Sequence, residues 1–214
     1  MKRIIAVVGD YYHPEENCRE ALRLALKGEN ADLRFVATDR LADALEESPD
    51  VVVLFKEDRI APHEDGHARW MTEPVATAVT RYVEQGGGWL AWHSGLASYD
   101  PAGTYIRMLR GHFLHHPQTH QTVRYMPEGS AFGQTQAFEF PDEHYFVKCD
   151  ESHTEVFLRS SSIDGESIAG WRHRVGQGRV CCLTPAHLPA GLTNPDFLRV
   201  LGGALQWCGQ AVSD

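Results

Sequence analysis

Histidines supply the chemistry that this sequence of 214 residues could perform, and there are twelve of them. His93 directly follows the apolar residues 89–92, and His187 comes shortly after the apolar residues 180–183. A third group lies between them in the chain and comprises His112, His115 and His116. Imidazole titrates near neutral pH and binds divalent metals, so histidines that meet in space can serve as acid and base or as metal ligands.

The first half of the sequence alternates strands with helices. We predict strands at residues 3–8, 33–37, 51–55 and 89–92, and helices at residues 15–28, 41–47 and 74–86. Residues 51–55 are a continuous run of Val, Leu and Phe, typical of a parallel strand that is covered on both faces. The alternation predicts an α/β fold of the flavodoxin-like type, with a doubly wound, mainly parallel sheet and flanking helices.

The second half changes character, with short strands and little helix between them. Strands are predicted at residues 122–126, 137–140, 145–148 and 154–160, and then a hairpin at residues 167–175 and 179–183. Asn194 is expected to cap a last amphipathic helix that runs through Trp207. We therefore expect extra antiparallel strands in the C-terminal half. With no repeat or linker in view, residues 1–214 are interpreted as one domain.

Ligands of a doubly wound sheet bind outside the carboxyl ends of its strands. This rule selects four places, which are Gly9-Asp10-Tyr11, residues 55–59, His93-Ser94-Gly95 and residues 184–189. The group at residues 111–117 lies just downstream of the third. His63 and His67, four residues apart, have a metal-like spacing, but Pro62 and Gly66 disfavour a helix there, so we interpret both as exposed histidines.

Charge and cysteine usage exclude several classes of function. The formal net charge is -9 and no Lys/Arg cluster is present, which argues against nucleic acid and anionic membranes as partners. No run approaches the ~20 apolar residues that span a bilayer. The number of cysteines, five, is odd and the chain is not small, which argues against a disulfide framework. No Cys-x-x-Cys pair is present, which argues against a thiolate zinc site. A reducing cytoplasm is the simplest location, and a homo-oligomer is the default assembly.

Several motifs, in the right order, resemble the ThuA-like (trehalose utilisation) family from residue 51 onward. The glycine-led strand Gly86-Gly87-Gly88-Trp89-Leu90-Ala91-Trp92-His93-Ser94-Gly95 is its signature, and Gly111-His112-Phe113 with His116-Pro117 matches a second element. The remaining matches are Asp142-Glu143-His144-Tyr145, Ile168-Ala169-Gly170-Trp171, Gly176-Gln177-Gly178-Arg179-Val180, His187, Asn194-Pro195 and Trp207. Each motif is weak alone, whereas the ordered set is specific.

The resemblance implies the fold of class I glutamine amidotransferases without their cysteine nucleophile. By position, His93 occupies the nucleophile's place and His187 that of the catalytic histidine, and none of the five cysteines falls at the elbow. Glutaminase activity is therefore not expected. If the two histidines face each other, they can act as acid and base, with Glu143 as a further catalytic residue, or bind a divalent metal with His116, zinc being the first expectation.

The family name implies a sugar or keto-sugar as the ligand. Stacking rings and hydroxyl groups suited to a sugar are expected from five residues, which are Tyr11, Trp92, Ser94, Tyr99 and Tyr145. Two functions of different classes remain open at this point. One is a hydrolase or isomerase of a sugar or keto-sugar, and the other is a non-catalytic carbohydrate-binding or regulatory module on the same fold. A metallohydrolase with another substrate is a third option.

Overall fold

The computed structural model describes residues 1–64, 68–129 and 132–210. A nine-stranded sheet crosses these residues in the order β2-β1-β3-β4-β11-β10-β9-β6-β7. Its parallel part consists of β1 (Lys2–Val8), β2 (Ala31–Phe35), β3 (Val51–Phe55), β4 (Gly88–Trp92) and β11 (Gly178–Leu183). The sheet continues through antiparallel pairs formed by β10 (Gly165–Val175), β9 (Glu155–Ser162), β6 (Gln121–Pro127) and β7 (Phe138–Asp142).

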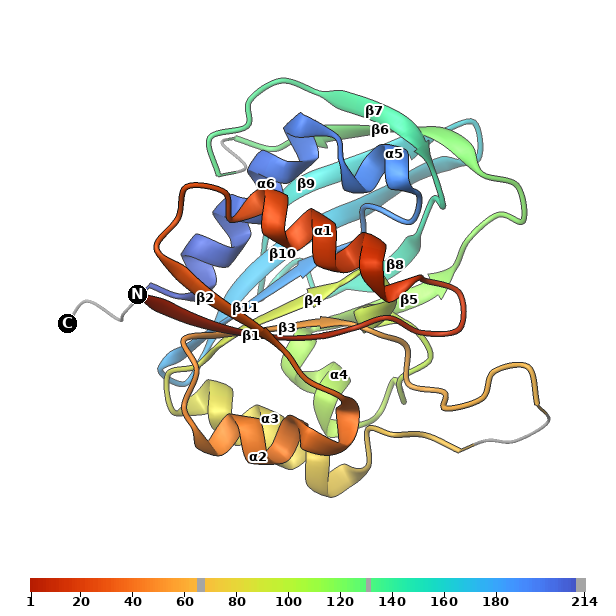
Figure 1. The fold of residues 1–214 in the computed structure, drawn as a ribbon. Coiled ribbons are helices and arrows are strands. Elements are labelled where there is room, and N and C mark those ends of the chain that lie inside the picture. Colours follow the sequence, from red (N-terminus) through yellow and green to blue (C-terminus); the bar gives the residue numbers. More distant parts are fainter. Residues whose placement is uncertain (65–67, 130–131, 211–214) are drawn as a thin grey trace.

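Helices cover both faces of the parallel part (Figure 1). One face carries α1 (Glu15–Ala25) and α6 (Pro195–Cys208), with the short α5 (Pro189–Leu192) beside them. The other face carries α2 (Leu41–Glu46), α3 (Glu73–Glu84) and α4 (Thr104–Leu109). A separate ribbon of β5 (Gly111–His115) and β8 (Phe146–Cys149) lies near the carboxyl end of β4. The predicted doubly wound α/β fold with added antiparallel strands is confirmed.

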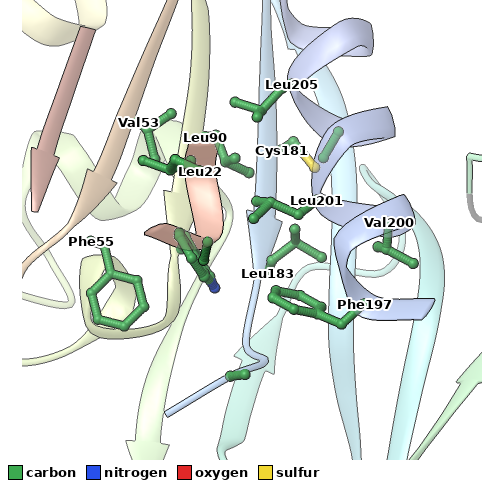
Figure 2. Close-up of a cluster of buried hydrophobic side chains, with 14 of the residues drawn as sticks. Leu22, Val53, Phe55, Leu90, Cys181, Leu183, Phe197, Val200, Leu201 and Leu205 are labelled. Carbon is green, nitrogen blue, oxygen red and sulfur yellow. The ribbon is translucent and has the colours of Figure 1, made fainter. Parts of the chain in front are cut away.

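Alternating side chains of the strands build two apolar layers, one on each face of the sheet. On the α1 and α6 side, Leu201 and Leu205 of α6 pack on the strand residues Cys181 and Leu183 (Figure 2). Val52, Leu54 and Trp89 belong to the layer on the other side. Because β3 and β4 are buried along their whole length, they form a rigid base for the residues that follow them.

Local sequence signals account for most element boundaries. The side chain of Asn194 accepts hydrogen bonds from the N–H groups of Asp196 and Phe197, as expected of the cap of α6. The strand predicted at residues 33–37 lies at Ala31–Phe35 instead, because residues 36 and 37 lead into a 3₁₀ turn at Thr38–Arg40. The helices α4 and α5 and the strand β5 were not predicted from the sequence. No helix among the described residues is long and apolar enough to cross a membrane.

Candidate functional site

A sharp turn presents His93 at the carboxyl end of β4. His93 has a φ of 48°, in the left-handed region that non-glycine residues rarely adopt, and it opens the 3₁₀ turn His93–Leu96. Gly95 in this turn passes directly over β3, since a Cβ atom there would lie 2.1 Å from the carbonyl oxygen of Leu54. The strained turn is the elbow expected at this position, with a histidine in place of a nucleophile.

Four side chains converge beside this elbow. They are His13, His93, Glu143 and His187, and their ligand atoms all lie within 4.8 Å of one another. His13 follows β1, Glu143 follows β7, and His187 follows β11. The Nε2 atom of His13 lies 2.9 Å from Nδ1 of His187, and Oε2 of Glu143 lies 3.4 Å from that same Nδ1. The strand-end rule therefore places three of the four groups, and the antiparallel half supplies the fourth.

Two of the histidines are held by acceptors outside the cluster. Nδ1 of His13 donates to Asp10 at 2.6 Å, and Nδ1 of His93 donates to the carbonyl oxygen of Thr184 at 2.6 Å. With Nδ1 protonated, the neutral ring of each histidine has its lone pair on Nε2, which faces the cluster. Nε2 of His93 is buried and has no hydrogen-bond partner among the described residues. Outer acceptors that fix the histidine tautomer in this way are the usual second layer of a metal site.

Asp10 is the buried anion behind His13. Its carboxylate also accepts hydrogen bonds from the Ser94 hydroxyl at 2.7 Å and from the backbone N–H groups of Glu57 and Tyr12. Burial works to raise the pKa of Asp10, but the hydrogen bond from His13, the charge of that ring and the other donors together lower it to about 2. The carboxylate is therefore ionised at any pH near neutrality and keeps the His13 ring in one orientation.

The electrostatics of the cluster favour a neutral His93 beside an ionised Glu143. Complete burial lowers the pKa of His93 to about 4 against the opposing effect of Glu143, which lies 3.5 Å away. Burial works to raise the pKa of Glu143, but its interactions with the neighbouring His187 and His93 hold it well below its usual range. Burial also works against a charged His187, whose pKa is nevertheless raised by Glu143. A neutral imidazole and a carboxylate are the forms that bind metals.

Asp142, next to Glu143, fixes the backbone on which His187 stands. Its carboxylate accepts from the N–H group of His187 at 2.7 Å and from the Tyr125 hydroxyl at 2.6 Å. Burial raises the pKa of Asp142 to about 6 against these hydrogen bonds. The Asp142-Glu143 pair therefore has two distinct tasks, because one carboxylate positions His187 and the other faces the histidine rings.

Two further histidines lie on the outer side of Glu143. Nε2 of His116 lies 3.5 Å from Oε1 of Glu143, and Nε2 of His120 lies 3.9 Å from the same oxygen. Both side chains are partly exposed, in contrast to the fully buried His93. His116, expected as a metal ligand, thus lies outside the group of four in this structure. The Glu143 carboxylate separates an inner, buried cluster from an outer, solvent-facing pair.

The five residues expected to bind a sugar fall in three different environments. Tyr145 stacks on the His93 ring with 4.1 Å between ring centroids, and Tyr11 is 61% exposed and stacks on His63. Ser94 is buried with its hydroxyl group on Asp10. Trp92 and Tyr99 are enclosed in the core, where they donate to the carbonyl oxygens of Pro185 and Lys56. His67, which the sequence predicts to be an exposed histidine, lies outside the described residues.

His13 and His120 are the members of the site that sequence reasoning missed. His13 lies three residues after Asp10, at a strand end that the strand-end rule had already selected. An acidic residue and a histidine so close together at that edge were the available signal. His120 lies in the connection between β5 and β6 and carries no comparable pattern.

Replacing Asp10 by asparagine is expected to weaken metal binding at this cluster without unfolding the protein. An amide is nearly the same size but does not offer two anionic acceptors, so His13 loses its fixed tautomer and orientation. Loss of such an outer partner typically lowers metal affinity by about 10–100-fold. The measurement is a competition titration of zinc against a chelator, with circular dichroism as the check on folding. Unchanged affinity in Asp10→Asn would contradict the role given to Asp10.

Comparison with known proteins places this chain in a family. The family model for ThuA proteins, described as trehalose utilisation, matches residues 3–208. The chain therefore belongs to the ThuA family. No curated protein matches the sequence.

Solved structures support the same fold. A ThuA-like protein from Bacteroides uniformis is 17% identical with a TM-score of 0.73, and the alignment covers 97% of this chain and 91% of that one. A cytoplasmic protein from Salmonella typhimurium LT2 is 16% identical with a TM-score of 0.62, covering 98% and 97% of the two chains. The β-galactosidase from Bacillus circulans is 13% identical with a TM-score of 0.67, covering 95% of this chain and 30% of that enzyme.

Proposed function

We propose that this protein is a metal-dependent enzyme that acts on a sugar or keto-sugar, with His13, His93, Glu143 and His187 as the metal ligands. The observation that carries the proposal is the convergence of three imidazole nitrogens and one carboxylate, all within 4.8 Å of one another. The buried Nε2 atom of His93, which has no partner among the described residues, supports it further. Without a cation, that lone pair faces a carboxylate and is left unsatisfied.

The spacing of the cluster fits a first-row metal. Two ligand atoms that each lie about 2.1 Å from a metal, at angles of 90–110°, are about 3.0–3.4 Å apart. Three of the separations among the four groups, at 2.9, 3.4 and 3.5 Å, lie within or close to that range, and all the ligand atoms lie within 4.8 Å of one another. Three imidazoles and a carboxylate suit zinc, and also manganese or nickel. Zinc remains the first expectation.

A divalent metal in this position acts as a Lewis acid toward a carbonyl or hydroxyl oxygen of a substrate. Side chains of the protein would transfer protons and exclude water. Glu143 faces the histidine rings with one oxygen and the outer pair with the other. His116 and His120, being partly exposed, can exchange protons with solvent and pass them to a substrate at the mouth of the site. Tyr145 stacks on His93 and closes the inner side against water.

Support for a sugar as the substrate comes from the family and from the rim of the site. The family's description is trehalose utilisation. This chain is also similar in fold to a part of a β-galactosidase, 30% of that enzyme's chain. The exposed ring of Tyr11, stacked on His63, offers an aromatic face at the mouth. Aromatic faces combined with polar groups are the usual environment of a bound sugar. The cytoplasm and a homo-oligomer are proposed as location and assembly, and the Salmonella neighbour is described as cytoplasmic.

Elemental analysis of untagged protein tests the proposal. Wild type should carry close to one zinc, manganese or nickel ion per chain, whereas His93→Ala and His187→Ala should carry little. The same three proteins are then screened for hydrolysis and isomerisation of sugars and keto-sugars, and the variants should be inactive. If His93→Ala keeps both its metal and its turnover of a sugar that wild type converts, the proposed role of His93 as a metal ligand is wrong.

A metal-free acid/base site is the second candidate, and one contact favours it. The 2.9 Å separation between His13 and His187 is also a hydrogen-bond distance, which would link Asp10, His13, His187 and Glu143 in a proton-carrying chain. No metal in wild type after incubation with divalent ions, together with turnover, would select this chain. Sugar binding without any turnover would select the non-catalytic binding module.

A further inference from the structure

The turn between β10 and β11 lies at the end of the sheet where β1 begins and α6 ends, opposite the histidine cluster (Figure 1). The two strands carry a cluster of arginines there. A cavity of about 550 Å³ opens there between the β10–β11 hairpin, the last turn of α6 and residues 152–155. Arg172, Arg174 and Arg179 line it, with Trp207 as an apolar wall. Among the lining residues, Glu155 alone is acidic. None of these groups takes part in the histidine site.

Arg179 is the unusual member of this cluster. Its side chain is only 6% exposed, and its buried Nε atom has no hydrogen-bond partner among the described residues. The guanidinium lies on the face of the Trp207 ring, with Cζ 5.1 Å from the ring centroid. Burial, followed by the neighbouring Arg174 and Arg172, lowers the pKa of Arg179. A buried guanidinium without a carboxylate partner is rare, because its N–H groups lose water and gain nothing in return.

The other two arginines bring charge to the same place. Arg174 is paired directly with Arg179 across the β10–β11 ladder, so their side chains lie on one face of the hairpin. Arg172 lies two residues earlier on that face. Its guanidinium is paired with Glu155, with Nε 2.9 Å from the carboxylate, and lies 5.3 Å from the Trp207 centroid. Glu155 therefore balances Arg172, while Arg174 and Arg179 have no acidic partner among the residues that the structure describes.

We propose that this arginine cluster is a second ligand site, which binds the phosphate or carboxylate group of a small anionic molecule. A guanidinium that stacks on an aromatic ring keeps its N–H edge free, and that edge matches two oxygens of an oxyanion. Arg179 supplies the buried edge, held in place by the Trp207 ring, and Arg174 adds a second cation from the exposed side. The site is independent of the proposed chemistry at the histidines.

A purely structural role for Arg179 is the competing explanation. The carbonyl end of α6 lies close by, and a cation near the C-terminus of a helix stabilises it modestly. That role requires no ligand and would not involve Arg174, which is exposed. The two explanations therefore differ in what an anion does to the protein, and in whether Arg174 matters for it.

Calorimetric titration with inorganic phosphate, and separately with malonate, distinguishes a ligand site from a purely structural role of Arg179. The ionic strength is held constant with chloride. The proteins are wild type, Arg179→Gln and Arg174→Gln, with Arg124→Gln, an exposed arginine of β6, as the matched control. We expect saturable binding in wild type and in the control, weakened by roughly tenfold or more in the other two, as for a lost charge-assisted hydrogen bond. Arg174 is exposed, so its variant should fold even if Arg179→Gln does not.

The relative strength of the two probes identifies the group that the site takes. Tighter phosphate binding indicates a phosphorylated ligand, and tighter malonate binding indicates a carboxylated one. Either result supports the proposal. Absence of saturable binding in wild type would overturn it. Equal binding by wild type and Arg174→Gln would also overturn it, because the anion would then lie elsewhere, for example at the histidine cluster.

Discussion

Replacement of His13 by alanine is expected to strip the protein of its divalent metal, whereas replacement of His116 by alanine is expected to leave the metal in place. Nε2 of His13 faces the cluster at 2.9 Å from Nδ1 of His187. His116 reaches only the outer oxygen of Glu143, at 3.5 Å. Removing a ligand should cost more than the ~10–100-fold loss of affinity seen when an outer partner is removed.

The measurement is metal content after dialysis against a weak chelator, by elemental analysis of wild type and both variants. Turnover of a sugar substrate supplies the second readout, since His116→Ala should lower activity while keeping the metal if it carries protons at the mouth. Metal loss in His116→Ala together with retention in His13→Ala would instead favour the ligand set predicted from sequence, which is His93, His116 and His187.

Among substitutions that add one methyl group near the site, Gly95→Ala is expected to lower the stability of the protein most. A Cβ atom would lie 2.1 Å from the Leu54 carbonyl oxygen, which belongs to a fully buried strand and cannot yield. The turn must move away from β3, and His93 moves with it. We expect a loss of roughly 3 kcal/mol in the free energy of unfolding, at the high end for overpacking, together with loss of metal.

Urea unfolding followed by fluorescence measures this change, with Gly129→Ala as the control. Gly129 has a φ of 66° and open space around its Cα atom, so alanine there carries backbone strain of only about 1 kcal/mol. If Gly95→Ala were no less stable than Gly129→Ala, the close approach of the elbow to β3 would be wrong.

The periodicity of the sequence was sufficient to predict the fold because each strand of the parallel part is marked by its own composition. Residues 51–55 and 88–92 are continuously apolar, and both are buried strands. The helix α4 and the strand β5 were not predicted because both are short, and β5 pairs with β8, which lies more than thirty residues further along the chain. Such long-range pairing is absent from any local window of sequence.

The residues of the site that directly follow strands of the parallel part could be predicted from the sequence. His93 and His187 follow β4 and β11, which are neighbours in the sheet, and the structure brings their rings to 5.5 Å between centroids. Glu143 was selected by the family motif and lies in the same cluster. His13 was missed because its role depends on Asp10, a buried carboxylate whose hydrogen bonds come from three separate segments. Spacing along one chain does not reveal such a network.

The four residues proposed as metal ligands are spread over almost the whole chain, at positions 13, 93, 143 and 187. Three follow strands of the parallel part, while Glu143 follows β7 at the far edge of the antiparallel part. An ion held by all four would act as a cross-link between the two parts, one that exists only in the folded chain. The free energy of metal binding then adds directly to the free energy of unfolding, so the resistance of the protein to heat would rise and fall with the metal supplied by its surroundings.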